Sequence, residues 1–134
     1  MERVNRIWNH PLYQQNFRLL LSLEADRKFC RHGLDHCLDV ARLACLYEWE
    51  AGRQPDREQI YAAALLHDLG RAREYREGIP HDQASRELAA QILPDCGYSE
   101  QEQRAILEAI GSHRGAGPQP EDGGPGGAGR PQNT

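Results

Sequence analysis

The 134-residue chain lacks several features that would assign it to a broad class. No run of about 18 apolar residues occurs, which excludes a membrane span, and the first residues, MERVNRIWNHPLY, lack the apolar stretch of a secretory signal. The four cysteines form no CxxC pair, so reduced thiols are expected. A net charge of −4 leaves no basic surface for a nucleic-acid backbone. We expect a cytoplasmic protein with no membrane partner and no nucleic-acid polymer as partner.

Glycine and proline are unevenly distributed. Residues 115–134 hold 7 of the 13 glycines and 4 of the 8 prolines, and contain no Leu, Ile, Val, Phe, Trp, Tyr or Met. Such a segment buries too little apolar area to offset the entropy of ordering it. We therefore expect residues 1–114 to fold as one helical domain and residues 115–134 to form a disordered tail.

Strand signals are scarce, because threonine occurs only at position 134 and no stretch alternates over five residues. Helical periodicity dominates instead. The sequence predicts an all-α bundle of five or six helices. The segments expected to be helical run from Pro11 (with Asn9 as cap) to Cys30, from Leu34 to Glu50, from the capping box Asp56–Gln59 to a terminating Gly70, from His81 to Leu93, and from the capping box Ser99–Glu102 to His113.

Four histidines share the apolar stripe of their helices. His36 precedes Val40, Leu43 and Tyr47 at helical spacing, while His67, His81 and His113 align with isoleucine, leucine and alanine positions of three further helices. Each lies at an end of its segment. A lone histidine on such a face is usually structural, but four imidazoles directed at one core are costly unless a metal ion binds them.

Asp68 directly follows His67 in the apolar stretch AAALLHDLG. A neutral nitrogen donor beside an anionic oxygen donor suits Fe, Mn, Co, Ni or Zn. Taken alone, Asp68 also fits a buried salt bridge or a capped helix end. The combined set of His36, His67, Asp68, His81 and His113 favours a metal site.

These residues resemble the HD-domain superfamily of metal-dependent phosphohydrolases. The resemblance covers about residues 28–114 and is carried by HCLDVARLA from His36, LLHDLGR around His67–Asp68, PHDQASRELA at His81 and AIGSHRG at His113. It implies that His36, His67 and Asp68 bind a primary divalent transition metal and that His81 and His113 help to bind a second. Asp68 would bridge the two ions. The superfamily's last aspartate has no clear match, since the only later one, Asp122, lies among glycines.

The resemblance implies hydrolysis of a nucleotide or another small phosphoester. Asp68 would orient or deprotonate the attacking water, and Arg71 and Arg31 would offset the phosphate charge. His32, one helical turn before His36, would contact the substrate or a ligand, or act as a cap.

Two alternatives stay open at this point. One is a catalytically degenerate HD domain that binds a nucleotide or a partner protein, which the missing aspartate favours. The other is a di-iron oxygenase with a similar His/Asp set. The sequence names neither the substrate, nor the metal, nor the oligomeric state.

Overall fold

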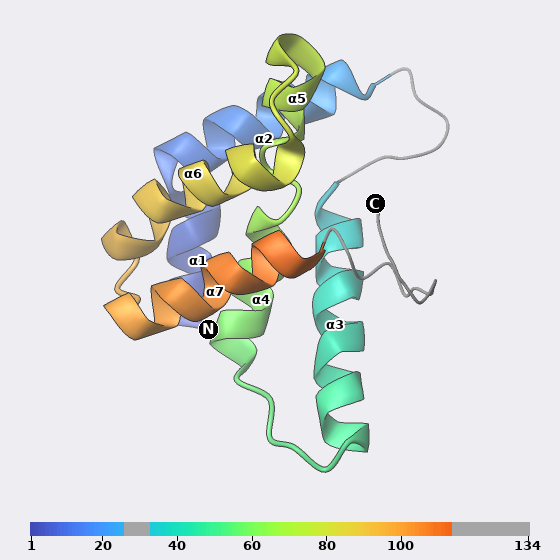
Figure 1. Ribbon diagram of the computed structural model, residues 1–134, viewed down its shortest axis with the longest axis vertical. Helices are drawn as coiled ribbons and strands as arrows, with labels where there is room; N and C mark the ends of the chain where they lie inside the picture. The colour runs from blue at the N-terminus through green and yellow to red at the C-terminus, as the bar shows by residue number, and fades with distance from the viewer. Residues whose placement is uncertain (26–32, 114–134) are drawn as a thin grey trace.

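The computed structural model describes residues 1–25 and 33–113, without the side chains of residues 112 and 113 (Figure 1). This part of the chain contains seven α helices and no strand, which confirms the predicted all-α class. The helices are α1 (Glu2–Asn9), α2 (Pro11–Leu23), α3 (Leu34–Glu50), α4 (Arg57–Leu66), α5 (Arg71–Glu77), α6 (His81–Asp95) and α7 (Glu100–His113). The predicted tail, residues 115–134, lies outside the described residues.

Two of these helices, α1 and α5, were not among the five segments predicted to be helical. Helix α1 has only eight residues and two buried side chains, Val4 and Ile7, so its apolar spacing extends over barely two turns. Helix α5 has seven residues, RAREYRE, and buries only Ala72. Short helices with one or two apolar positions are held by packing rather than by their own periodicity.

Helix ends agree with the sequence where a side chain caps them. The Asp56 carboxylate accepts a hydrogen bond from the Gln59 amide at 3.2 Å, and Ser99 and Glu102 exchange reciprocal bonds, as the predicted capping boxes require. The cap of α2 is His10 rather than Asn9, because its Nδ1 accepts from the Leu12 amide at 3.1 Å.

Two predicted helix ends are wrong. Helix α2 ends at Leu23, with a turn at residues 24 and 25, and the predicted continuation toward Cys30 then enters residues that the structure does not describe. Gly70 does not terminate α4, which already ends at Leu66. Gly70 instead precedes α5 with an ordinary φ of −81°.

Helix α4 lies at the centre of the bundle and packs against α1, α3, α6 and α7. Most sides of this helix carry apolar residues, as expected for a helix with neighbours all around it, and Ala62, Leu65 and Leu66 are buried. They join a core built from α1, α2, α6 and α7 that includes Ile7, Tyr13, Phe17, Leu69, Leu88, Ile92, Leu93, Ile106 and Ile110. The His67–Asp68 pair at the end of α4 is therefore carried into the interior.

Helix α3 lies at the edge of the bundle and packs mainly on α4 (Figure 1). Its buried side chains are Cys37, Ala41 and Cys45. The predicted inward stripe of α3 is thus wrong, since Leu43 and Tyr47 are 66% and 67% exposed. The small residues face α4 because they allow close approach to a helix that is itself rich in alanine.

None of the helices in the described ranges is both long and apolar enough to cross a bilayer.

Candidate metal centre

The His67–Asp68 pair lies in a tight turn that connects α4 to α5. Ser85 of α6 holds this turn, because its hydroxyl accepts from the Gly70 amide at 2.8 Å and donates to the His67 carbonyl at 2.9 Å. Ser85 is completely buried, so both hydrogen bonds are shielded from water. The HDLG sequence is therefore fixed from α6 as well as from α4.

Three of the predicted ligands lie together at this turn. One ligand atom each from His36, His67 and Asp68 lies within 4.8 Å of the other two. The Asp68 Oδ2 atom is 3.0 Å from His67 Nε2 and 3.6 Å from His36 Nε2. His67 and Asp68 are buried, whereas 43% of the His36 side chain is exposed. The group is thus buried on the α4 side and open to solvent on the α3 side.

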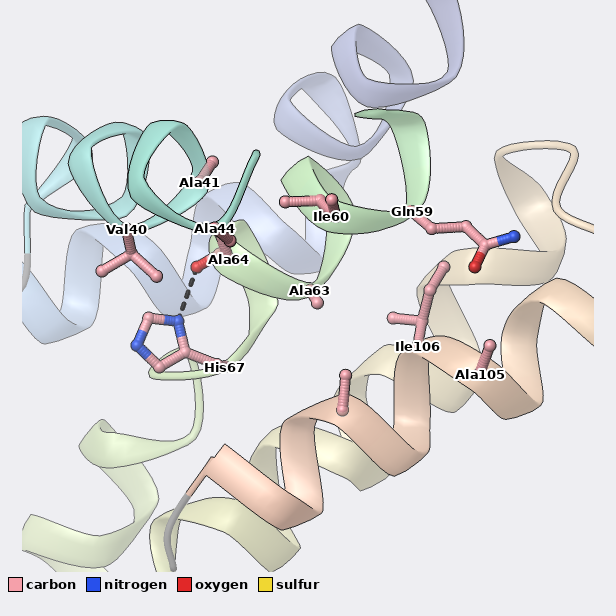
Figure 2. A pocket seen from close by; sticks show the side chains of 11 residues that line it. Val40, Ala41, Ala44, Gln59, Ile60, Ala63, Ala64, His67, Ala105 and Ile106 are labelled. Atoms are coloured by element: carbon pink, nitrogen blue, oxygen red, sulfur yellow. Dashed lines mark hydrogen bonds between the residues drawn. The ribbon is translucent and has the colours of Figure 1, made fainter. Parts of the chain in front are cut away.

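The orientation of His67 leaves Nε2 as the atom facing this group. Its Nδ1 lies 2.7 Å from the Ala64 carbonyl oxygen, the contact drawn as a dashed line in Figure 2. A carbonyl oxygen can only accept, so Nδ1 donates the proton. In a neutral imidazole Nε2 then carries the lone pair, which is the form that binds a metal ion.

The Asp68 carboxylate divides its two oxygens between two tasks. Oδ1 accepts a hydrogen bond from Arg71 Nε at 2.8 Å, one helical turn further on. Oδ2 faces the two imidazoles. The Arg71 side chain is 25% exposed and also lies 3.8 Å from a Glu74 carboxylate oxygen. Arg71 therefore fixes the carboxylate while part of its guanidinium remains accessible.

These three residues fit a divalent metal ion. Two ligand atoms bound side by side at about 2.1 Å from an ion lie about 3 Å apart, and the separations from Asp68 Oδ2 of 3.0 and 3.6 Å are close to that value. The donor set of two imidazole nitrogens and one carboxylate oxygen is the chemistry expected for a first-row transition metal.

His81 is not part of this group. It is the first residue of α6, and its Nδ1 lies 3.2 Å from a carboxylate oxygen of Glu74 in α5. Burial lowers the pKa of His81, Arg71 lowers it further, and Glu74, Asp68 and Asp82 act in the opposite direction. The role of His81 as a ligand of a second ion stays a prediction.

Three further predicted site residues cannot be placed. Arg31 and His32 lie outside the described residues. The backbone of His113 ends α7, but its side chain is outside the described part. Their roles likewise stay predictions.

The sequence did not reveal two buried titratable side chains. Glu24, only 2% exposed, accepts a 2.6 Å hydrogen bond from the Tyr75 hydroxyl, which links the end of α2 to α5. Cys37, next to His36, is buried, and burial together with the negative charge of Asp68 raises the pKa of its thiol to about 12. Neither feature has a sequence signal, because each depends on which helix lies opposite.

A groove between α3 and α7, with α4 as its floor, reaches His67 (Figure 2). Its volume is about 250 Å³, and six alanines line it together with Val40, Ile60, Ile106 and the polar Gln59. His67 therefore belongs both to the lining of the groove and to the group of three candidate ligands.

Comparison with known proteins agrees with this geometry. A family model described as HD domain matches residues 33–133, and the chain belongs to this family. HD domains generally form a metal-dependent hydrolase fold, and a His/Asp group that could hold a metal is present here. No solved structure matched the chain.

Several bacterial proteins are similar to the chain. An uncharacterized protein of Clostridium beijerinckii is 40% identical over 114 residues, which cover 85% of this chain and 73% of that protein. Ribonuclease Y of Enterococcus faecalis is 29% identical over 79% of this chain, and ribonuclease Y of Pseudothermotoga lettingae is 31% identical over 78%. The chain spans only 18% of the length of each of these two ribonucleases.

Proposed function

We propose that this protein is a metal-dependent phosphohydrolase that acts on a nucleotide or another small phosphoester. The observation that supports it is the convergence of His36, His67 and Asp68 from two helices on one point at the end of α4. The chain's membership of the HD domain family supports the same class of chemistry.

His36, His67 and Asp68 would hold the divalent ion. When bound, such an ion supplies a water-derived nucleophile at neutral pH and draws electron density from a phosphoryl oxygen. Asp68 orients the water through Oδ2, and Arg71 keeps the carboxylate in place through Oδ1. The exposed part of the Arg71 guanidinium offsets the charge of the substrate phosphate.

Other predicted residues belong to the same proposal. His81 and His113, at the ends of α6 and α7, would contribute to a second ion, and Arg31 and His32 would contact the substrate. The solvent-exposed side of His36 gives the substrate its approach to the group.

RNA is a second candidate substrate, because the matched part of ribonuclease Y is 29–32% identical to this chain. The net charge of −4 opposes it, since a long polyanion is bound through basic surfaces. A test of function should therefore include an RNA oligonucleotide beside mononucleotides and small phosphoesters.

The test begins with elemental analysis of the purified protein. Phosphate release is then measured on that substrate panel with the metal found, or with Mn, Co, Fe or Zn supplied. We expect bound transition metal and metal-dependent phosphate release from a small phosphoester. His67→Ala and Asp68→Asn should each lower metal retention at least tenfold while the helical circular dichroism persists. Asp95→Asn, at the exposed far end of α6, is the matched control and should keep both properties.

Three outcomes would decide against the proposal. Unchanged metal content in both site variants would refute the assignment of the ligands. A metal-free protein whose melting temperature ignores chelators would indicate the degenerate binding domain. Two irons with an oxygen-sensitive absorption band would indicate the oxygenase.

A further inference from the structure

Helix α3 exposes large apolar side chains on the face opposite its packing surface. In the described part of the chain, four of the seven exposed large hydrophobic residues lie on this one helix: Leu43 (66%), Leu46 (49%), Tyr47 (67%) and Trp49 (52%). Single exposed apolar residues are ordinary, but a contiguous group on one helix marks an interaction surface. We call the exposed side of α3 between Asp39 and Glu50 the outer face.

The outer face is turned away from the bundle. Cys37, Ala41 and Cys45 are buried against α4, so the outer face lies on the far side of the helix. No other described helix packs extensively against α3. Residues 114–134 contain no Leu, Ile, Val, Phe, Trp, Tyr or Met and therefore offer no large apolar side chain to cover it. Within the described residues the outer face is therefore not covered by another helix and is available to a partner.

We propose that the partner is a second copy of this chain, which pairs its own α3 antiparallel to the first across a twofold axis at Leu46. In such a pairing, a residue that lies n positions before Leu46 in one copy is opposite the residue n positions after Leu46 in the other copy. Leu46 then meets Leu46, and Leu43 meets Trp49. The exposed apolar side chains thus cover one another in the middle of the contact.

The charges on the outer face support this register. Arg42 and Glu50, four positions on either side of Leu46, lie opposite each other. Opposite charges therefore meet on both sides of the twofold axis, which repeats the pair.

A different register is less favourable. Shifting the axis to lie between Leu43 and Leu46 places Asp39 opposite Glu50, which are like charges. The charge pattern therefore favours the register centred on Leu46 over this shifted one.

Sedimentation over a range of protein concentrations tests the proposal on the full-length protein. We expect a reversible monomer–dimer equilibrium, and Leu46→Glu should weaken the dimer at least tenfold without loss of helix content. Arg42→Glu and Glu50→Arg should each weaken it about threefold to tenfold. The double variant should recover most of the affinity, since the opposed charges again have opposite signs.

Cysteine cross-linking tests the position of the axis. In a Cys30→Ser background, Leu46→Cys places each new thiol opposite its own copy and should give a linked dimer on mild oxidation or with a short bismaleimide. Asp35→Cys is the matched control on the same helix, because its two copies would lie about 33 Å apart at 1.5 Å per residue. It should not cross-link.

The proposal is overturned by a wild-type protein that stays monomeric at high concentration. It is equally overturned by a dimer that tolerates Leu46→Glu, or by equal cross-linking of the two cysteine variants, since either result places the contact elsewhere. None of these readouts depends on metal binding or activity, so they test the dimer separately from the proposed function.

Discussion

Gly70 is the position where a single added methyl group should do most harm to the turn that carries His67 and Asp68. Its φ of −81° is accessible to any residue, so backbone strain is not the reason for a glycine here. The reason is close approach to α6: a Cβ at position 70 would lie 2.4 Å from the Ser85 backbone nitrogen and 2.6 Å from the Ala84 Cβ. Neither neighbour is the flexible end of a side chain, so α6 itself would have to move.

The expected cost of Gly70→Ala follows from two contributions. Overpacking a rigid interior costs about 1–3 kcal/mol. Moving α6 away also stretches the two hydrogen bonds of the Ser85 hydroxyl, each worth about 1 kcal/mol. The entropy gained by replacing glycine returns about 0.4–1 kcal/mol. A net loss of about 3 kcal/mol corresponds to a fall in melting temperature of roughly 10 °C in a chain of this length.

Urea denaturation followed by circular dichroism measures this loss, with Gly111→Ala as the matched control. Gly111 lies inside α7, and its added Cβ would come no closer than 3.5 Å to the Arg86 side chain. That variant should be stabilised by about 0.5–1 kcal/mol through helix propensity. If Gly70→Ala proves as stable as the wild type, the close packing of α6 on the HDLG turn is not a constraint and the reasoning fails.

Three further predictions concern stability. Ser85→Ala should lower the free energy of unfolding by about 1–3 kcal/mol, because the Gly70 amide and the His67 carbonyl lose this buried partner. Denaturant titration measures the loss, with Ser22→Ala at an exposed position as the control. Arg3→Leu should cost about 1 kcal/mol at pH 7, because Arg3 binds the carboxylates of both Glu58 and Glu102; a variant as stable as the wild type would contradict this. The same pairing lowers the pKa of Glu102 to about 2, so its contribution is complete above pH 4.5 and disappears as the pH falls toward 2. The difference between wild type and Arg3→Leu should therefore shrink over that range, and a constant difference would show that the ion pairs are not its source.

Local signals along the chain sufficed for much of the fold. The capping boxes at Asp56 and Ser99 and the periodicity of the longer helices predicted α3, α4, α6 and α7 close to their observed starts. Helices α1 and α5 were missed because each is short, spanning only about two turns, and buries no more than two side chains. Their positions depend on packing against other helices, which no local pattern records.

The candidate site was predicted for a reason that was only partly correct. His36 was expected on the inward stripe of α3, yet it lies beside that stripe, and 43% of its side chain is exposed. It still comes within 3.6 Å of Asp68, because the start of α3 lies next to the end of α4. The error arose from choosing Leu43 and Tyr47 as the buried face, when the smaller Cys37, Ala41 and Cys45 allow the closer contact. Which of two apolar stripes faces the bundle depends on the shape of the neighbouring helix.

Within the described residues α3 packs mainly on α4, and this has a consequence for how the molecule would respond to a metal ion. His36 lies on α3, and His67 and Asp68 lie in the turn that follows α4, so an ion bound by all three would tie α3 to the centre of the bundle. If α3 moved away from α4, the ion would lose His36 as a ligand. Release of the ion and separation of the two helices would therefore occur together. Amide hydrogen exchange should accordingly slow in α3 more than in α6 or α7 when the ion is added, which would make the supply of metal a control on how long this edge stays closed.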